Sequence, residues 1–426
     1  MELLYKIYLQ RSAMMSLTYI DIFAGAGGLS EGFLKNGYIP VAHVEMKNEA
    51  CFTLKTRTCY YYLKEQGRIE DYNRYLKNEI SREELYTMIP EVLLNTVINK
   101  TMDKPGMTVL YEHIDELMRI QKVASIDVLV GGPPCQAYSL VGRARSENNM
   151  EGDPRNYLYE LYADMLIKYH PRMFVFENVP GLLTAKGGKY FNDMRESFRN
   201  AGYELDFDIL NSNEFGVLQN RRRVILIGKK IGEKYHYPKL EKVEHGYSVA
   251  DLLKDLPSIQ PGEKNNVYAT NPTKYLWATG IRTKDDILTW HEARPNLERD
   301  RKIYSCVIKA WDENKTRLKY TDLPKELCTH KNRKSFLDRF KIVASDLRHS
   351  QTMVAHISKD GHYFIHPDIN QARSISVREA ARIQSFPDNY YFEGSRTAAF
   401  LQIGNAVPPL MAGAIAIALK KQLGVH

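Results

Sequence analysis

Residues 126–139 read Ile-Asp-Val-Leu-Val-Gly-Gly-Pro-Pro-Cys-Gln-Ala-Tyr-Ser, and this stretch decides the fold class. Its first five residues form a short apolar, β-branched run of the kind found in buried parallel strands, and open α/β sheets bind their ligands where such strands end. The two prolines restrict the backbone before Cys135, while Gly131 and Gly132 allow a close approach. A lone cysteine is more often a buried structural residue. A thiol on a rigid, exposed loop suits a nucleophile better, so Cys135 is the candidate nucleophile.

The N-terminal part of the chain has the order expected of a nucleotide-binding unit. Residues 17–23 read as a first strand, a glycine-rich turn follows at 25–28, and residues 30–36 are amphipathic. The match to a dinucleotide fingerprint is incomplete, because Ser30 stands where the third glycine would be. Residues 41–45 form a second short strand that ends in Glu45, about 20 residues after Gly25, the usual place for a carboxylate that accepts from ribose hydroxyls. Glu45 is therefore the candidate ribose ligand, and a solvated acid is the alternative.

Two further polar clusters stand beside predicted strands. Residues 173–176 form another short apolar strand, followed by Glu177-Asn-Val-Pro-Gly. A carboxyl group at such a strand end can be partly removed from water and share a proton with a base, so Glu177 is the candidate acid. Gln219-Asn-Arg-Arg-Arg223 lies between strands predicted at 203–211 and 223–228. Residues two apart face the same way on a strand, so Arg221 and Arg223 are expected to converge on one ligand.

Pro133-Pro-Cys-Gln136 resembles the nucleophile motif of the DNA cytosine-5 methyltransferases, and further motifs follow in that family's order from about residue 19 to residue 419. Residues 21–28 are similar to the family's S-adenosylmethionine-binding segment, and residues 376–387 and 404–409 are similar to its last two motifs. The resemblance implies S-adenosylmethionine as cofactor and the following residues as its binding site: Asp21, Phe23, Gly25, Gly27, Glu45, Asp115, Pro134 and Asn405. Among them, Asp115 would contact the adenine amino group and Asn405 the methionine end. No metal is expected.

The resemblance also implies the reaction. Carbon 5 of cytosine is too electron-poor to attack a methyl donor until a nucleophile has added to carbon 6, which is the role implied for the Cys135 thiolate. Glu177 would stabilise the protonated ring nitrogen. Arg221 and Arg223 complete the catalytic set, with Arg223 on the cytosine carbonyl. The target base must be flipped out of the duplex to reach such a pocket.

The composition indicates a two-lobed protein and suggests a polyanionic partner, although a soluble basic enzyme would have a similar charge. The chain has 426 residues, a net charge of +8 and a pI near 8.9. Five scattered cysteines without a Cys-x-x-Cys pair argue against disulfides and structural zinc. The N-terminus lacks a signal-peptide core, and no apolar run is expected to approach the roughly 18 residues that span a bilayer. We expect a cytoplasmic, nucleoid-associated protein that acts as a monomer on double-stranded DNA. A cognate restriction endonuclease, acting separately, is a further partner suggested by the resemblance.

The predicted fold is α/β, a doubly wound, mostly parallel sheet of the Rossmann-like methyltransferase type with a second, smaller DNA-recognition domain. Residues 1–234 would form the catalytic and cofactor-binding domain, with a helical insertion at about 60–105 in which Ser81-Arg-Glu-Glu84 is a capping box. Residues 235–392 would form the target-recognition domain, and residues 393–426 would return to the catalytic domain. Residues 348–368 have β-like patterning, with Lys359-Asp-Gly361 as a hairpin turn.

Cations and aromatic residues alternate between about residues 235 and 341, which is the pattern expected where phosphates and bases are bound. For any single member a solvated charged face is the alternative. The residues are Lys284, Arg294, Arg299, Arg301, Lys302, Lys319, Lys331, Arg333 and Arg339, together with Trp277, Trp290, Tyr304, Trp311 and Tyr320.

Three other functions stay open at this point. An RNA cytosine-5 methyltransferase would share the motifs, although the long basic region favours DNA. A nicotinamide-dependent oxidoreductase would explain residues 25–45, yet it leaves the Pro-Pro-Cys motif and Glu177 without a role. A non-catalytic DNA-binding regulator would be expected to lack Cys135 or Glu177, and both are present.

Overall fold

A computed structural model describes residues 16–134, 157–232, 236–330 and 333–425, and the chain divides into two compact units. Unit 1 comprises Met1–Phe215, Arg222–Val243 and Pro409–His426, and unit 2 comprises Gly216–Arg221 and Glu244–Pro408. The units are thus divided after residues 215, 221, 243 and 408. The division after residues 234 and 392 that the sequence indicates stays a prediction. Residues 236–243 stay with unit 1 because the Tyr237 hydroxyl donates to the Ile225 carbonyl and the Val243 amide donates to the Glu214 carbonyl.

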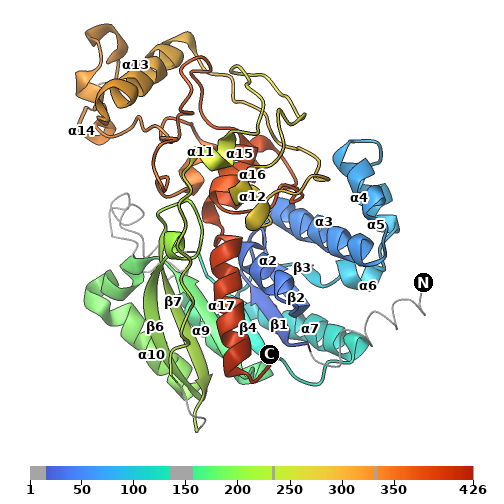
Figure 1. Cartoon of the computed structure of the whole chain (residues 1–426). Helices are drawn as coiled ribbons and strands as arrows, with labels where there is room; N and C mark the ends of the chain where they lie inside the picture. Colours follow the sequence, from blue (N-terminus) through green and yellow to red (C-terminus); the bar gives the residue numbers. More distant parts are fainter. Residues whose placement is uncertain (1–15, 135–156, 233–235, 331–332, 426) are drawn as a thin grey trace. The chain divides into compact units, whose positions relative to one another are not determined.

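Unit 1 is built on a seven-stranded sheet with the order β3-β2-β1-β4-β5-β7-β6 (Figure 1). Strands β1 to β5 pair in parallel, whereas β7 runs antiparallel to both β5 and β6. The prediction of a doubly wound α/β fold with a mostly parallel sheet is confirmed. The strands are β1 (Thr18–Ile22), β2 (Ile39–Glu45), β3 (Val97–Asn99), β4 (Val128–Gly131), β5 (Met173–Asn178), β6 (Tyr203–Asn211) and β7 (Arg222–Lys230).

Helices complete the core of unit 1. One large apolar core joins the strands to α7 (Met107–Gln121), α9 (Leu158–Tyr169) and α10 (Lys189–Asn200). Elsewhere α2 (Gly28–Lys35) packs against α17 (Pro409–Gln422), and the two helices run side by side in Figure 1. Their approach is close, because a Cβ atom at Gly32 would lie 2.4 Å from the Gly413 amide nitrogen. The Tyr38 hydroxyl, just after α2, donates to the Ala416 carbonyl at 2.9 Å.

The predicted insertion is helical but shorter than expected. After α3 (Asn48–Glu65) it consists of α4 (Ile69–Leu76), α5 (Arg82–Thr87) and α6 (Glu91–Leu94). The capping box of α5 is present, since the Glu84 amide donates to Ser81 Oγ and the Ser81 amide donates to the Glu84 carboxylate. Residues 97–99 are not part of the insertion, because they form β3 of the sheet.

One stretch, Arg396–Gln422, is long and apolar enough to cross a membrane, which the sequence analysis did not expect. The structure divides it into α16 (Arg396–Asn405) of unit 2 and α17 of unit 1. Within its apolar window 67% of the residues are buried inside the protein. Length and apolarity are features that core helices share with membrane spans, so this stretch is only weak evidence for a membrane.

Unit 2 has mainly helices and loops. Its helices are α11 (Ala250–Leu253), α12 (Lys274–Ala278), α13 (Glu298–Asn314), α14 (Arg333–Phe336), α15 (Val377–Ile383) and α16. Among its described residues β-structure is limited to isolated bridges, such as the one between Ile342 and Ile365. The predicted hairpin at Lys359-Asp-Gly361 is wrong, since the preceding residues Ala355–Ser358 form a 3-10 turn.

Several aromatic residues that the sequence assigned to base binding lie in the core of unit 2. Tyr304, Trp311 and Tyr320 pack in an apolar cluster around α13, and none is more than 8% exposed. Trp277 on α12 is 57% exposed. Tyr304, Trp311 and Tyr320 of the alternating pattern are therefore explained by packing around α13 and not by contact with bases.

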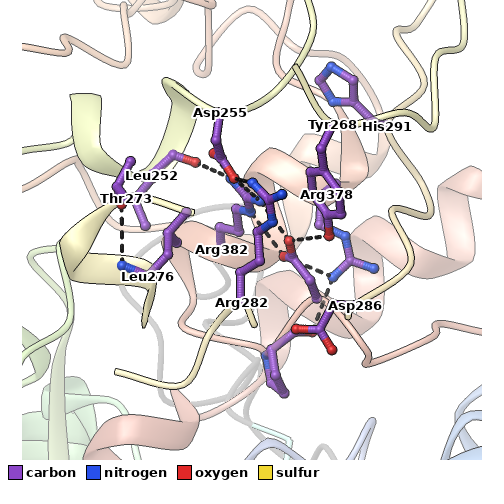
Figure 2. Close-up of polar contacts among 12 residues, drawn as sticks. Leu252, Asp255, Tyr268, Thr273, Leu276, Arg282, Asp286, His291, Arg378 and Arg382 are labelled. Atoms are coloured by element: carbon purple, nitrogen blue, oxygen red, sulfur yellow. Dashed lines mark hydrogen bonds and ion pairs between the residues drawn. The ribbon is translucent and has the colours of Figure 1, made fainter. Parts of the chain in front are cut away.

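A buried ion network connects distant segments of unit 2 around α15 (Figure 2). The Arg382 guanidinium donates to Asp255 and to Asp388, each at 2.6 Å, and Arg282 also pairs with Asp255. The Tyr268 hydroxyl donates to Asp388 at 2.7 Å. Buried charges are tolerated when they are paired in this way. The segment 376–388 thus connects to Asp255 and Tyr268, more than 100 residues earlier in the chain, through buried polar contacts.

Candidate active site

The glycine-rich turn after β1 has three residues in the left-handed region of the backbone. Phe23 has φ 57°, Gly25 has φ 55° and Gly27 has φ 75°. Glycine adopts this conformation freely, but a bulky residue such as Phe23 does so at a cost, and such residues cluster at functional sites. Among the described residues, and apart from the chain neighbours of Gly25, no atom lies within 4 Å of a Cβ position there, so the space beside the turn is open.

Glu45 is held rigidly next to this turn. It ends β2, and its Oε2 accepts from the Gly25 amide at 2.9 Å while its Oε1 accepts from the Lys47 amide at 2.8 Å. Each carboxylate oxygen has a second lone pair, so the oriented group can still accept from two hydroxyls. A fixed carboxylate beside an open glycine turn fits the ribose of a nucleoside cofactor.

Asn99 is a neighbour of Glu45 that the sequence analysis missed. It ends β3 and is paired with Glu45 in the sheet register. Its Nδ2 lies 3.2 Å from both the Glu45 carbonyl and Cys51 Sγ, and burial raises the pKa of the Cys51 thiol to about 11. The signal that could have found Asn99 is a polar residue at the end of a short apolar run, but β3 is only three residues long including Asn99.

Asp115 is placed differently from the expectation. It lies in the middle of α7, with its side chain 47% exposed, and pairs with Lys168 of α9 at 2.7 Å. Carboxyl ends of parallel strands bind ligands in this fold, and the strand that precedes α7 ends at Asn99 instead. The structure thus places the Asp115 carboxylate in a surface ion pair between two helices, and its assignment to the adenine amino group stays a prediction.

Asp21 lies inside unit 1 at the end of β1. Its side chain is 1% exposed, and Oδ2 accepts a hydrogen bond from Ser30 Oγ at 2.7 Å. Burial raises the pKa of Asp21 to about 7, the Ser30 hydrogen bond opposes this shift, and the negative charge of Glu45 adds to it. Asp21 is therefore a buried group that can hold a proton near neutral pH.

Glu177 and Arg223 meet at the same edge of the sheet. Glu177 lies near the end of β5, and β7 runs antiparallel, which brings its first residues to that edge. Arg223 Nε lies 2.7 Å from Glu177 Oε1, and both side chains are 12% exposed. A carboxyl group beside a guanidinium can bind the ring nitrogen and the carbonyl oxygen of one pyrimidine edge.

The loop after β4 is fitted against these residues. A Cβ atom at Gly132 would lie 2.6 Å from Glu177 Oε2, and Asn178 Nδ2 donates to the Pro133 carbonyl at 3.2 Å. Pro134 is exposed and is the last described residue before a gap. Cys135 lies outside the described residues, so its assignment as nucleophile stays a prediction, as does that of Pro134 to the cofactor.

Arg221 and Asn405 both belong to unit 2. Arg221 is fully buried, and its guanidinium donates to the carbonyls of Met353 at 2.5 Å and Gly404 at 3.1 Å. Because these donors serve the core of unit 2, the expected convergence of Arg221 with Arg223 on one ligand is not found. Asn405 is the exposed last residue of α16, and its contact with a cofactor stays a prediction.

The chain is similar to known proteins in both sequence and fold. The sequence model of the C-5 cytosine-specific DNA methylase family matches residues 108–421. The chain is 42% identical to the type II methyltransferase M.Bpa9945I of Bacillus paralicheniformis, over 96% of this chain and 99% of that protein. It is 28% identical to the type II methyltransferase M1.HphI of Haemophilus parahaemolyticus, over 96% and 87% of the two chains. Among solved structures, a putative DNA modification methyltransferase encoded within a prophage of E. coli has a TM-score of 0.62 at 20% identity and covers 96% of this chain and 100% of its own.

Proposed function

Because this chain belongs to the C-5 cytosine-specific DNA methylase family, we propose that it methylates carbon 5 of a flipped cytosine in a specific duplex DNA sequence, through a covalent adduct with Cys135. Membership of the family makes the protein a DNA cytosine-5 methyltransferase of the restriction-modification type. The flipped base and the covalent adduct are the finer parts of the proposal. The observation that carries it is the Glu177–Arg223 pair beside Gly132, three residues before Cys135.

Cys135, Glu177 and Arg223 each have a chemical task in this reaction. The Cys135 thiolate adds to carbon 6 of the cytosine and thereby makes carbon 5 nucleophilic. Glu177 holds the proton on the ring nitrogen, and Arg223 donates to the neighbouring carbonyl, so the negative charge that develops in the ring is stabilised. Once carbon 5 has taken the methyl group, a base removes its proton and the thiolate leaves carbon 6, which restores the aromatic ring. Arg221 is left out of this scheme because its donors are used within unit 2.

S-adenosylmethionine is the cofactor that the family uses, and when bound it supplies the electrophilic methyl group. The open turn at Gly25 and the fixed carboxylate of Glu45 fit its ribose. Phe23, Gly27, Pro134 and Asn405 are further proposed contacts.

A duplex that contains 5-fluorocytosine at the target position tests the covalent step. Fluorine cannot leave carbon 5 as a cation, so the reaction should stall after methyl transfer and leave a denaturation-resistant protein–DNA adduct that requires S-adenosylmethionine. Peptide mapping should place the adduct on Cys135, and Cys135→Ala should form none while still binding DNA through phosphate contacts. An adduct on Cys51, Cys59, Cys306 or Cys328, or methylation by Cys135→Ala, would overturn the assignment.

Unit 2 is proposed to read the target sequence, since specificity comes from contacts with base edges and not from phosphate contacts. A chimera that carries the recognition region of another family member should methylate that member's site. An active chimera that retains the original site would contradict this role. Incubation with labelled cofactor and either duplex DNA or transfer RNA separates the DNA enzyme from an RNA-methylating one.

We further propose that the protein works in the cytoplasm as a monomer on DNA. Its methylation would protect host DNA from a cognate endonuclease that acts separately. The net charge of +8 supports a nucleic-acid partner.

A further inference from the structure

Asp21 differs from other deeply buried carboxylates of this protein in lacking a cationic partner. Among the described residues, four other acidic side chains are at most 1% exposed, and each pairs with an arginine. These pairs are Glu31 with Arg57, Asp255 and Asp388 with Arg382, and Glu379 with Arg373. Among the residues that the structure describes, no lysine, arginine or histidine forms an ion pair with Asp21.

Neutral or acidic groups surround Asp21 instead. Ser30 Oγ of α2 donates to it, and the Tyr19 hydroxyl of β1 donates in turn to Ser30 Oγ at 3.1 Å. His43 Nε2 of β2 lies 3.4 Å from the Tyr19 hydroxyl, and burial lowers the pKa of His43 to about 4, so this ring is neutral. The other titratable groups that interact with Asp21 are the Glu45 carboxylate of β2 and the Tyr162 phenol of α9.

A carboxylate in this environment would be an unpaired buried charge next to a second negative charge. Proteins avoid such a charge by keeping the group protonated. Asp21 is nonetheless the second-to-last residue of β1. It lies two residues before Phe23, where the turn that is proposed to bind S-adenosylmethionine begins. That cofactor carries a positively charged sulfonium and an ammonium group, which can take the place that arginine has at the other buried acids.

We propose that Asp21 carries a proton in the free protein and that binding of S-adenosylmethionine releases this proton to solvent. The step converts a carboxylic acid and a cation into a carboxylate–cation pair plus one proton taken up by the buffer. The inference rests on the proposed cofactor, and it makes cofactor affinity depend on pH through a residue that takes no part in methyl transfer.

Calorimetric titration of the full-length protein with S-adenosylmethionine measures the released proton directly. The binding enthalpy is compared in buffers with different ionisation enthalpies at pH 6, 7 and 8. The wild-type protein should release up to one proton at pH 6 and progressively less at pH 7 and 8. Its affinity should rise about tenfold from pH 6 to pH 8, as linkage requires for one group that titrates near neutrality.

Asp21→Asn is the matched variant, since it keeps the size of the side chain and the acceptor for Ser30 but cannot ionise. The amino group of the cofactor also titrates near pH 8, so the informative quantity is the difference between wild type and variant. On binding the cofactor at pH 6, Asp21→Asn should release fewer protons than the wild type. As the pH rises, the affinity of the wild type for S-adenosylmethionine should increase more than that of the variant. Ser30→Ala removes the donor that favours the carboxylate, so its proton release should extend to higher pH.

The possible results separate the inference from the proposed function. Equal proton release and parallel pH dependence in the wild type and Asp21→Asn would overturn the inference while leaving the cofactor assignment intact. Absence of S-adenosylmethionine binding in the wild type at every pH would overturn the proposed function itself. Thermal unfolding of each variant verifies that it is folded, and the Ser30→Ala titration decides the matter if Asp21→Asn is not.

Discussion

Gly132→Ala tests whether the close approach between the loop after β4 and Glu177 is needed for methyl transfer. The new Cβ atom would lie 2.6 Å from Glu177 Oε2 and 2.9 Å from the Glu177 carbonyl oxygen, whereas ordinary contacts begin at 3.4 Å. The carboxylate must therefore move by about 0.8 Å. The carbonyl belongs to β5, which is hydrogen-bonded between β4 and β7 and cannot shift easily. The loop at 132–134 and the Glu177 side chain must therefore move instead. Misplacement on this scale costs about 100-fold in rate, or about 2.7 kcal/mol in the barrier.

Single-turnover methylation of a target duplex measures this loss, and calorimetry with S-adenosylmethionine shows whether the cofactor site is intact. We expect cofactor affinity to change less than twofold, because Glu45 and Gly25 are untouched, and we expect a stability loss of about 1 to 3 kcal/mol from overpacking. Gly246→Ala is the control, since in the part of the chain that the structure describes no atom other than those of its chain neighbours lies within 4 Å of its Cβ position. A folded Gly132→Ala protein that methylates at the wild-type rate would refute the reasoning.

Three further substitutions give independent tests. Glu45→Ala should weaken S-adenosylmethionine binding by about 1.5 to 3 kcal/mol, the range for charge-assisted hydrogen bonds, and unchanged affinity by calorimetry in a folded protein would remove Glu45 from the site. Arg382→Met leaves Asp255 and Asp388 buried without their shared partner, so urea unfolding should show a loss of about 3 to 5 kcal/mol; a loss below about 1 kcal/mol would show that the network is dispensable. The folded protein keeps the Asp21 proton up to about pH 7 whereas an unfolded chain loses it near pH 3.8, so folded wild type binds more protons in this window and loses stability as pH rises. Asp21→Asn lacks this loss, and by pH 8 it should gain up to about 4 kcal/mol relative to wild type; stability curves that stay parallel from pH 4 to 8 would contradict it.

Local patterns in the sequence predicted the parts of the site that depend on neighbouring residues. The strand, glycine turn and helix at the N-terminus are specified within about 30 residues, and Glu45 follows because a short strand ends there. Glu177 is positioned by the same logic at the end of β5. Asp115 lies in α7 and not at the end of a strand, which spacing along the chain does not reveal, because the helices inserted before it lengthen that spacing.

Non-local packing explains what the sequence could not show. Arg221 and Arg223 are two residues apart, yet the chain passes from unit 2 to unit 1 between them. The Arg221 guanidinium therefore donates within the core of unit 2, whereas that of Arg223 pairs with Glu177 in the candidate site. Arg339, which was read as a cation for phosphate, pairs with Asp360 inside unit 2. A charged residue has the same appearance in a sequence whether it faces DNA or an acid from another segment, and only tertiary structure separates the two cases.

The packing of α17 against α2 also sets the order in which the protein can mature on the ribosome. The Tyr38 hydroxyl and its partner carbonyl at Ala416 are separated by 378 residues. At about 5 to 20 residues per second, synthesis of the intervening chain takes about 20 to 75 s. During this interval the surface of α2 that α17 will cover remains open, while the residues of unit 2 have already been made. The nascent chain therefore spends tens of seconds with an incomplete cofactor-binding unit, and methylating activity can appear only after nearly the whole chain has been translated.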